Sequence, residues 1–296
     1  KCVGTGTRTR RDVAGGRKRR LFRSWCCGKT TVADAAKSAG VTRQTVWRWF
    51  APFWTNPPGA RWPVRSRVLV VDGVSVVKHE LVALLAGDPK ISEPVGWGFA
   101  ARENFDAWRA FLLRLKSRGA NPEYVVSDGQ KGLLKAVREV FPGAVTQRCT
   151  VHVHRQAMIW LTRNPKTAAG RELRPVVSAL LLVRTVAQRD AWLKSLRSWE
   201  ARHSDFLKER TYGESRWWYT HRKPRAVRSL LRNAAPDLFR HVDDPAVPRT
   251  SNHVEGGLNS RIKELLRSHR GISKSQRQAL VCWYLDSRQK STRNVT

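Results

Sequence analysis

The sequence predicts a mixed α/β protein, in which helices pack on a β-sheet and a pair of short helices precedes the sheet. From about residue 66, short apolar and β-branched runs are separated by Gly, Asp and Pro turns, a pattern typical of strands. Later strands alternate with segments whose apolar residues recur at helical spacing. The 296 residues, of which 41% are hydrophobic, are enough for a sizeable core.

The chain is strongly basic, with 56 Lys and Arg against 23 Asp and Glu and a formal net charge of +33. Such a surface calls for a polyanionic partner, either nucleic acid or an anionic membrane face. There is no apolar stretch of about 18 residues and no signal-like segment, which favours nucleic acid. We therefore expect a soluble, intracellular protein. Because the chain opens with Lys1, we also expect a fragment or a processed start.

Residues 1–29 are rich in Arg and Lys and have no apolar periodicity, which predicts a loosely held, DNA-contacting basic arm. The alternative is a degenerate zinc ribbon, but a structural zinc needs four ligands and this segment has three cysteines. The five cysteines of the chain form neither an even disulfide framework nor a CxxC pair, which favours a reducing compartment. They are Cys2, Cys26, Cys27, Cys149 and Cys282.

Residues 30–50 have the spacing of a helix-turn-helix. A Ser-Ala-Gly break separates two helices, and Thr42 can cap the second, which turns Val46, Trp49 and Phe50 inward. An ordinary αα-hairpin shares this spacing, but the net charge favours DNA binding. The residues expected to face the major groove are Arg43, Gln44, Thr45 and Arg48.

The remaining chain divides into four parts. A proline-rich linker is expected at residues 51–65, because proline cannot continue a helix. The sheet domain follows at 66–155, with the order βββαβαβα, strands at 67–77, 80–87 and 94–100, and a helix capped by Asn104. A helical insertion without alternating strand patterns is expected at 156–248, and the last core helices at 249–290 with a break at Gly271.

Two aspartates follow apolar strand runs: Asp72 comes after VLVV and Asp128 after YVVS. The carboxyl ends of strands in α/β sheets are where ligands collect, so both are candidate site residues. The alternative is a plain turn, since Asp-Gly after an apolar run is also a hairpin signal. That alternative fits Asp72 well and Asp128 badly, because helical periodicity follows Asp128.

A third acid, Glu255, stands at the start of a helical segment beside two glycines. It is turned about 100° from the apolar stripe, on a face shared with Asn259 and Lys263. Gly256 and Gly257 cost a helix roughly 1 kcal/mol each, so we expect a backbone, a metal or a DNA strand to approach closely there. The alternative is a solvated first-turn acid. The stripe consists of Val254, Leu258, Ile262, Leu265 and Leu266.

Together the three acids predict a metal site. Phosphoryl transfer on DNA uses two Mg²⁺ ions about 3.5 to 4 Å apart, held by carboxylates, water and substrate oxygens. Two sheet carboxylates and one helix carboxylate could supply those ligands.

The strand order, the two aspartate motifs, QRCTVH at 147–152 and TSNHVEGGLNSRIKELLRSHRG at 250–271 resemble a DDE transposase of the Mutator-like superfamily, bacterial insertion-sequence type. The resemblance spans Val68 to Leu285. It implies a ribonuclease H-like mixed sheet with a helical insertion before the last acid. It also implies that Asp72, Asp128 and Glu255 are the catalytic, metal-binding triad, with Mg²⁺ as cofactor and Mn²⁺ as a substitute.

Cys149 and His152 match the Cys-x-x-His signature of that family, where we expect a buried thiol and a helix-capping histidine. The resemblance implies a homodimer or larger assembly that binds the element's terminal repeats and target DNA in the bacterial cytoplasm, on the nucleoid. The alternatives are a helix-turn-helix regulator, an inactive transposase remnant, and a structure-selective nuclease without strand transfer.

Further DNA contacts are expected outside the triad. In RWWYTHRKPR (216–225) the paired Trp217 and Trp218 lie among cations, which suits base stacking, although tryptophans are more often core residues. A basic helix face is expected to contact phosphates, with a solvated face as the alternative. Its residues are Arg261, Lys263 and Arg267.

Overall fold

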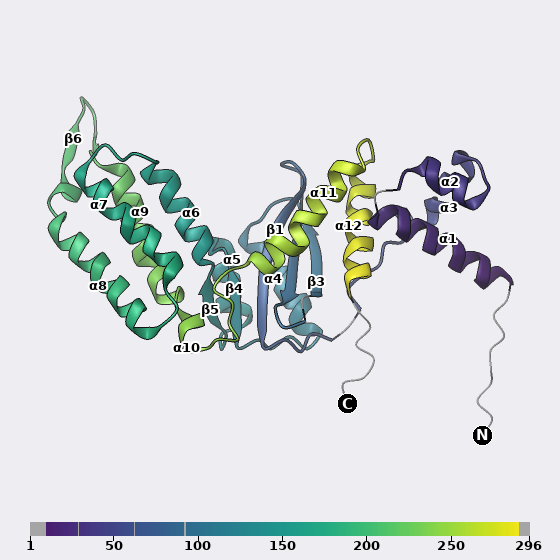
Figure 1. The fold of residues 1–296 in the computed structure, drawn as a ribbon, viewed down its shortest axis with the longest axis horizontal. Helices are drawn as coiled ribbons and strands as arrows, with labels where there is room; N and C mark the ends of the chain where they lie inside the picture. The colour runs from purple at the N-terminus through teal and green to yellow at the C-terminus, as the bar shows by residue number, and fades with distance from the viewer. Residues whose placement is uncertain (1–9, 29, 62, 92, 290–296) are drawn as a thin grey trace, which may run out of the picture.

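The structure is a computed structural model that describes residues 10–28, 30–61, 63–91 and 93–289. The β-sheet lies in the middle of the molecule, with the helical insertion on one side and the N-terminal helices on the other (Figure 1). Within the described residues, no helix is long and apolar enough to cross a membrane.

The sheet has five strands in the order β3-β2-β1-β4-β5. The first three strands are antiparallel, whereas β4 and β5 run parallel to β1. This mixed sheet with helices on it confirms the predicted α/β class and the predicted order of elements. The strands are β1 (Val68–Val77), β2 (Leu81–Asp88), β3 (Glu93–Ala100), β4 (Tyr124–Ser127) and β5 (Val145–Arg148).

Apolar side chains cover both faces of the sheet. One face buries alternate β1 residues such as Leu69 and Val71 against α4 (Phe105–Ser117) and α5 (Lys131–Val140). Asn104 caps α4 as predicted, since its side chain accepts from the Ala107 N–H. The other face buries Val68, Val70 and Val74 against the C-terminal helices.

Those C-terminal helices are η4 (His253–Asn259), which is a π-helix, α11 (Ser260–Ser268) and α12 (Lys274–Arg288). The predicted break is confirmed at Gly271, whose φ of 86° is in the left-handed region that glycine tolerates. The predicted apolar stripe is also confirmed, because all five of its residues are buried in the core: Val254, Leu258, Ile262, Leu265 and Leu266.

The basic N-terminal segment differs from the expectation of a loosely held arm. Residues Arg10–Cys27 form helix α1, which packs against α12 and α3. Phe22 and Trp25 are buried, and the ring of Phe22 lies 5.3 Å from that of Trp283. The expectation was wrong for this segment because a few aromatic side chains anchor the helix among many cations. Cys26 also points to α12, where its thiol donates to the Leu280 carbonyl; Cys2 lies outside the described residues.

The two helices predicted after this segment are present, as α2 (Val32–Ala39) and α3 (Arg43–Thr55). Gly40, with φ 67°, ends α2, and the side chain of Thr42 caps α3. Helix α3 continues through Pro52 to Thr55, so the linker does not begin at residue 51 as expected. Phe53 and Trp54 pack against the aromatic core, and this packing outweighs the break that proline favours.

The segment predicted as a helical insertion has its own apolar core. The prediction missed one feature, the two-stranded hairpin of β6 (Arg210–Tyr212) and β7 (Trp217–Tyr219). Strands of three residues are too short to show alternation in the sequence. The helices here are α6 (Thr150–Leu161), which begins the segment, α7 (Ala168–Ala179), α8 (Val186–Arg202), α9 (Arg222–Ala234) and α10 (Arg240–Asp243).

Candidate active site and nucleic-acid interface

Asp72 and Asp128 occupy equivalent positions on neighbouring parallel strands. The last paired residues of β1 and β4 are Val70 and Val126, and each aspartate lies two residues further along the chain, Asp72 within β1 and Asp128 directly after β4. Because side chains alternate with a period of two along a strand, Asp72 lies on the face of β1 on which Val70 is buried. The register of β1 with β4 thus brings two acids that are far apart in the sequence to the same level of the sheet.

The turn interpretation of Asp72 is wrong. Asp72 lies inside β1, opposite Leu85 of β2, and the hairpin turns at residues 78–80. Its neighbour β4 ends at Ser127, so beyond that level one edge of β1 is no longer paired with a strand. Asp128 follows directly, and its Oδ1 accepts from the Gln130 N–H at 2.9 Å.

Asn259 is a neighbour of Asp72 that the sequence did not reveal. Its Nδ2 donates to Asp72 Oδ2 at 2.6 Å, and its side chain is buried. The predicted α-helical phase had placed Asn259 on an outward face. Residues 253–259 instead form a π-helix, whose i→i+5 bonding changes that phase. Within the described residues, the buried Oδ1 of Asn259 has no hydrogen-bond partner.

The backbone of Glu255 lies in η4, which packs on β1 and β2. Gly87 of β2 allows this approach, because a Cβ there would lie only 2.9 Å from Val254 Cγ2. The side chain of Glu255 is outside the described part of the chain. Among the side chains that are described, no three His, Cys, Asp or Glu residues form a ready-made metal cluster.

We expected a backbone, a metal or a DNA strand close to Gly256 and Gly257, and no described residue of this chain fills that place. A Cβ built on Gly256 or Gly257 meets no described atom within 4 Å, and both glycines are exposed. The bare backbone of η4 therefore faces open space beside the sheet.

Glu103 is a further acid near Asp128. Its carboxylate covers Gly73, where a Cβ would overlap it, and its carbonyl accepts from Gln130 Nε2 at 2.6 Å. Burial, and then the negative charge of Asp128, raise the pKa of Glu103. No strand or motif pattern marks this residue in the sequence.

Arg148 supplies positive charge near Asp128. Its buried guanidinium fills the space in front of Gly129, which has φ 88°. Burial lowers the pKa of Arg148, an effect that the nearby Asp237 and Asp128 partly offset. The turn after β4 therefore packs against the buried guanidinium of Arg148.

Cys149 and His152 lie together at the start of α6. The predicted burial of the thiol is confirmed. The His152 Nδ1 lies 3.5 Å from Ser251 Oγ, so its ring links α6 to the segment before η4. Burial raises the pKa of Cys149, but hydrogen bonds with His152 and Ser251 outweigh it and leave the pKa below its usual value.

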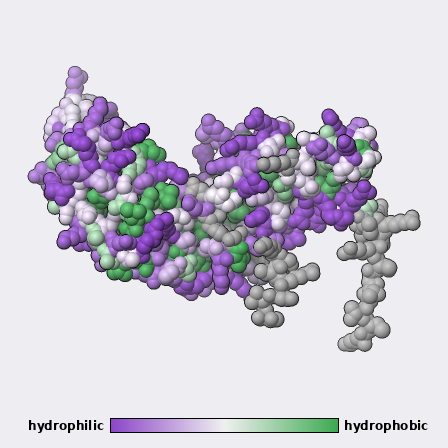
Figure 2. Space-filling view, in the orientation of Figure 1, coloured by the Kyte–Doolittle hydropathy of each residue, from purple (hydrophilic) through white to green (hydrophobic). Residues whose placement is uncertain are grey.

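The four residues predicted to contact DNA lie at the start of α3. Arg43, Gln44 and Arg48 are exposed, whereas Thr45 is half-buried and its N–H donates to Thr42 Oγ1. Hydrophilic residues cover much of the visible surface over these N-terminal helices (Figure 2).

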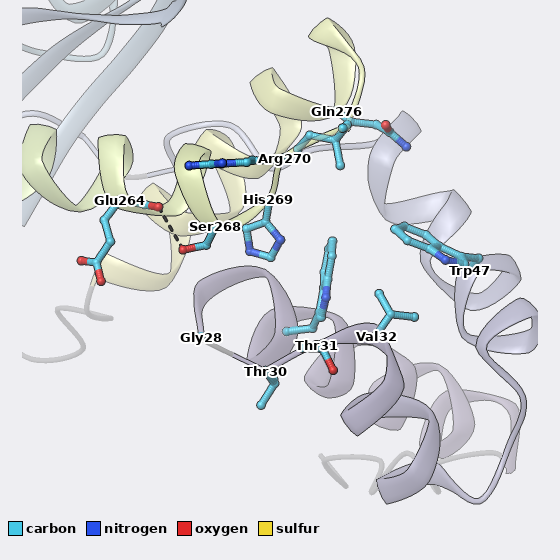
Figure 3. Close-up of a pocket in the computed structure, with 13 residues that line it drawn as sticks. Gly28, Thr30, Thr31, Val32, Trp47, Glu264, Ser268, His269, Arg270 and Gln276 are labelled. Carbon is cyan, nitrogen blue, oxygen red and sulfur yellow. Dashed lines mark hydrogen bonds between the residues drawn. The ribbon is translucent and has the colours of Figure 1, made fainter.

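Helices α2 and α3 lie beside the C-terminal helices across a cavity of about 620 Å³ (Figure 3). Trp47 and Thr31 line it from one side and His269 from the other. The ring of His269 lies 4.5 Å from that of Trp25. Burial lowers the pKa of His269. Helix α1, which carries Trp25, thus contacts the end of α11, and the cavity lies between that end and the helix pair α2 and α3.

Other predicted DNA contacts lie on α11 and on the hairpin. Arg261, Lys263 and Arg267 are exposed, and Arg261 pairs with Glu264. Trp217 is 45% exposed, and Trp218 lines an open cavity of about 430 Å³ between the hairpin and α9. Guanidinium groups stack on both rings, Arg210 at 4.0 Å from Trp217 and Arg222 at 5.6 Å from Trp218.

The fold and the site define a basic α/β protein with two aspartates level on adjacent parallel strands. The family described as "Transposase, Mutator family" matches residues 67–210. Over these residues, just under half of the chain, the sequence is similar to this family.

Curated relatives are named as insertion-sequence transposases. The chain is 43% identical over 95 residues to the "Transposase for insertion sequence element ISRM5" of Rhizobium meliloti, which covers 32% of this chain and 24% of that protein. It is 28% identical over 213 residues to the "Probable transposase for insertion sequence element ISRM3-like" of Sinorhizobium fredii, which covers 69% of this chain and 46% of that protein. The chain thus spans from a quarter to about half the length of these relatives.

Proposed function

We propose that this protein is a DNA transposase, which binds the ends of its element and catalyses metal-dependent strand cleavage and strand transfer. One observation carries the proposal: the register of β1 with β4 brings Asp72 and Asp128 to the same level, and the helix with Glu255 packs on β1 and β2. We take Asp72, Asp128 and Glu255 as the catalytic triad and the sheet as ribonuclease H-like. The names of the curated relatives support this assignment.

The residues around Asp72 fit a divalent metal such as Mg²⁺. Hard cations prefer oxygen ligands, and the site offers the carboxylates of Asp72 and Asp128. The buried Asn259 Oδ1 beside Asp72, without a partner in the described part of the chain, is a further oxygen donor. When bound, Mg²⁺ activates the attacking oxygen and stabilises the leaving oxygen of the phosphodiester.

The chain's own residues hold this site in place. Asn259 orients the Asp72 carboxylate through its amide N–H, and Arg148 partly balances the charge of Asp128. The exposed backbone of Gly256 and Gly257 leaves room for a DNA strand to approach the acids. These features support DNA cleavage beside Asp72 and Asp128, where β4 ends.

DNA is proposed to contact three surfaces. The start of α3 presents Arg43, Gln44, Thr45 and Arg48 to the element ends, in the manner of a helix-turn-helix. Arg261, Lys263 and Arg267 on α11 contact phosphates near the acids. Trp217 and Trp218 stack on unpaired bases, a role that the exposure of Trp217 and the arginines beside both rings support. Joining two ends requires a dimer or larger assembly, which acts on nucleoid DNA in the bacterial cytoplasm.

The test is cleavage and joining of DNA that carries the gene's own flanking ends, with Mg²⁺ or Mn²⁺. Asp128→Asn and Glu255→Gln should abolish both reactions and leave DNA affinity equal or higher, since each removes a negative charge. Glu264→Gln is the matched control, because Glu264 is an acid on the adjacent helix that pairs with Arg261 at the surface. Cleavage that persists in Asp128→Asn would overturn the triad. Binding without cleavage by every protein, including wild type, would identify a DNA-binding regulator or inactive remnant.

A further inference from the structure

The segment Gln147–His152, which carries the sequence QRCTVH, spans the end of β5 and the start of α6 and contacts three distant parts of the chain. The first is the turn that carries Asp128. The Cys149 N–H donates to the Ser127 carbonyl at 2.7 Å, one residue before Asp128. Arg148 fills the space in front of Gly129, one residue after it. This segment therefore holds the strand end on which Asp128 lies.

The second contact is with the end of the helical insertion. Gln147 is completely buried, although glutamine is usually exposed. Its Nε2 donates to the Leu238 carbonyl at 2.9 Å, and its Oε1 accepts from the His241 N–H at 3.3 Å. One side chain thus bridges to the backbone about ninety residues further along the chain, at the point where the insertion returns to the sheet.

The third contact is with the segment that enters η4. The Thr150 N–H and Oγ1 both donate to the Arg249 carbonyl, at 3.0 and 3.2 Å. His152 lies against Ser251 Oγ at 3.5 Å, and the Ser251 carbonyl accepts from the Val254 N–H at 2.9 Å, in the first turn of η4. The helix that carries Glu255 begins directly from these contacts.

We propose that the QRCTVH segment is a positioning element, which fixes the start of η4 relative to the strand end that carries Asp128. Thr150 and Arg249 are separated by 99 residues, so the covalent chain alone cannot set the distance between the two catalytic regions. The segment sets it by hydrogen bonds to both. The role of the Cys-x-x-His signature in this chain is then to join α6 to the entry of η4. This inference rests on the proposed function of Asp128 and Glu255.

The experiment measures backbone hydrogen exchange by mass spectrometry in the full chain. Thr150→Val with Ser251→Ala removes the Thr150 Oγ1 contact with the Arg249 carbonyl and the contacts of Ser251 Oγ with little change in volume. Thr150→Ser is the matched control, because it keeps the hydroxyl. Exchange at residues 249–259 should rise on the order of tenfold in the double variant, since two modest hydrogen bonds are lost. Exchange in α12 and in the control should stay at the wild-type level.

Cleavage is measured alongside exchange. If Glu255 is displaced, kcat should fall on the order of 10- to 100-fold with unchanged DNA affinity, and Thr150→Ser should retain activity. Wild-type exchange at residues 249–259 in the double variant would overturn the positioning role, as would an equal rise in α12. Failure of the proposed function is separate, because it appears as cleavage that survives Glu255→Gln, whatever the exchange result.

Discussion

Gly129 should tolerate no side chain, because its conformation and its surroundings both exclude one. Its φ of 88° lies where a non-glycine residue is strained, at about 1–3 kcal/mol. A Cβ there would also overlap Arg148, with Cζ at 2.6 Å and Nη2 at 2.7 Å. Arg148 is buried, so it cannot simply turn into solvent, and such overpacking costs about 1–3 kcal/mol. Gly129→Ala should therefore lose about 2–6 kcal/mol of unfolding free energy.

Thermal unfolding and DNA cleavage together test this estimate. At about 2–4 °C per kcal/mol, Tm should fall by roughly 10 °C. Since Asp128 is the preceding residue, cleavage at a permissive temperature should also fall, on the order of 10- to 100-fold. Gly143→Ala is the control, because Gly143 is exposed and a Cβ there would meet no described atom within 4 Å, so stability should change by less than about 0.5 kcal/mol. A Gly129→Ala protein that melts and cleaves like wild type would refute the packing argument.

Three further predictions follow from other contacts. Asn259→Leu removes the donor to the Asp72 carboxylate, so urea unfolding should show a loss of about 1.5–3 kcal/mol; an unchanged midpoint would contradict the bond's contribution. Cys27 has a pKa lowered to about 7, chiefly by its hydrogen bond with Cys26, so its iodoacetamide labelling should rise with pH through about 7, and a midpoint near 9 would contradict this. Trp217→Ala should weaken single-stranded DNA binding by about 1–3 kcal/mol in fluorescence anisotropy, whereas Ile159→Ala, an exposed apolar control on the insertion, should not.

The elements that the sequence predicts well are those whose pattern is repeated over several turns or residues. The strand of VLVVDGVSVV and the helix capped by Asn104 both follow from local periodicity and capping, and both are found. The N-terminal helix α1 could not be found in this way, because only a few apolar residues among many cations hold it. Its burial of Phe22 depends on Trp283, which lies near the other end of the chain, and no local pattern reports such a contact.

The candidate site shows the same division between local and long-range information. Asp72 and Asp128 stand out because each follows an apolar strand run, but their common level depends on the register of β1 with β4. Glu103 has no sequence signal, and Arg148 stands in the QRCTVH motif without a predicted role, since their places beside Asp128 come from tertiary packing against Gly73 and Gly129. Register and side-chain packing are tertiary properties. The sequence could therefore predict Asp72 and Asp128 as candidate residues, but not the positions of Glu103 and Arg148 around them.

The π-helix explains why the sequence analysis placed Asn259 on the wrong face of its helix. An α-helical projection of residues 250–263 separates Asn259 from the buried stripe, and the structure instead buries it against Asp72. Two adjacent glycines lower the helix propensity of this stretch, and π-turns occur often at functional sites. Gly256 and Gly257 meet no described atom that would demand their small size. We therefore infer that they serve the altered backbone, which lets η4 bring Asn259 onto Asp72 while Val254 and Leu258 stay in the core.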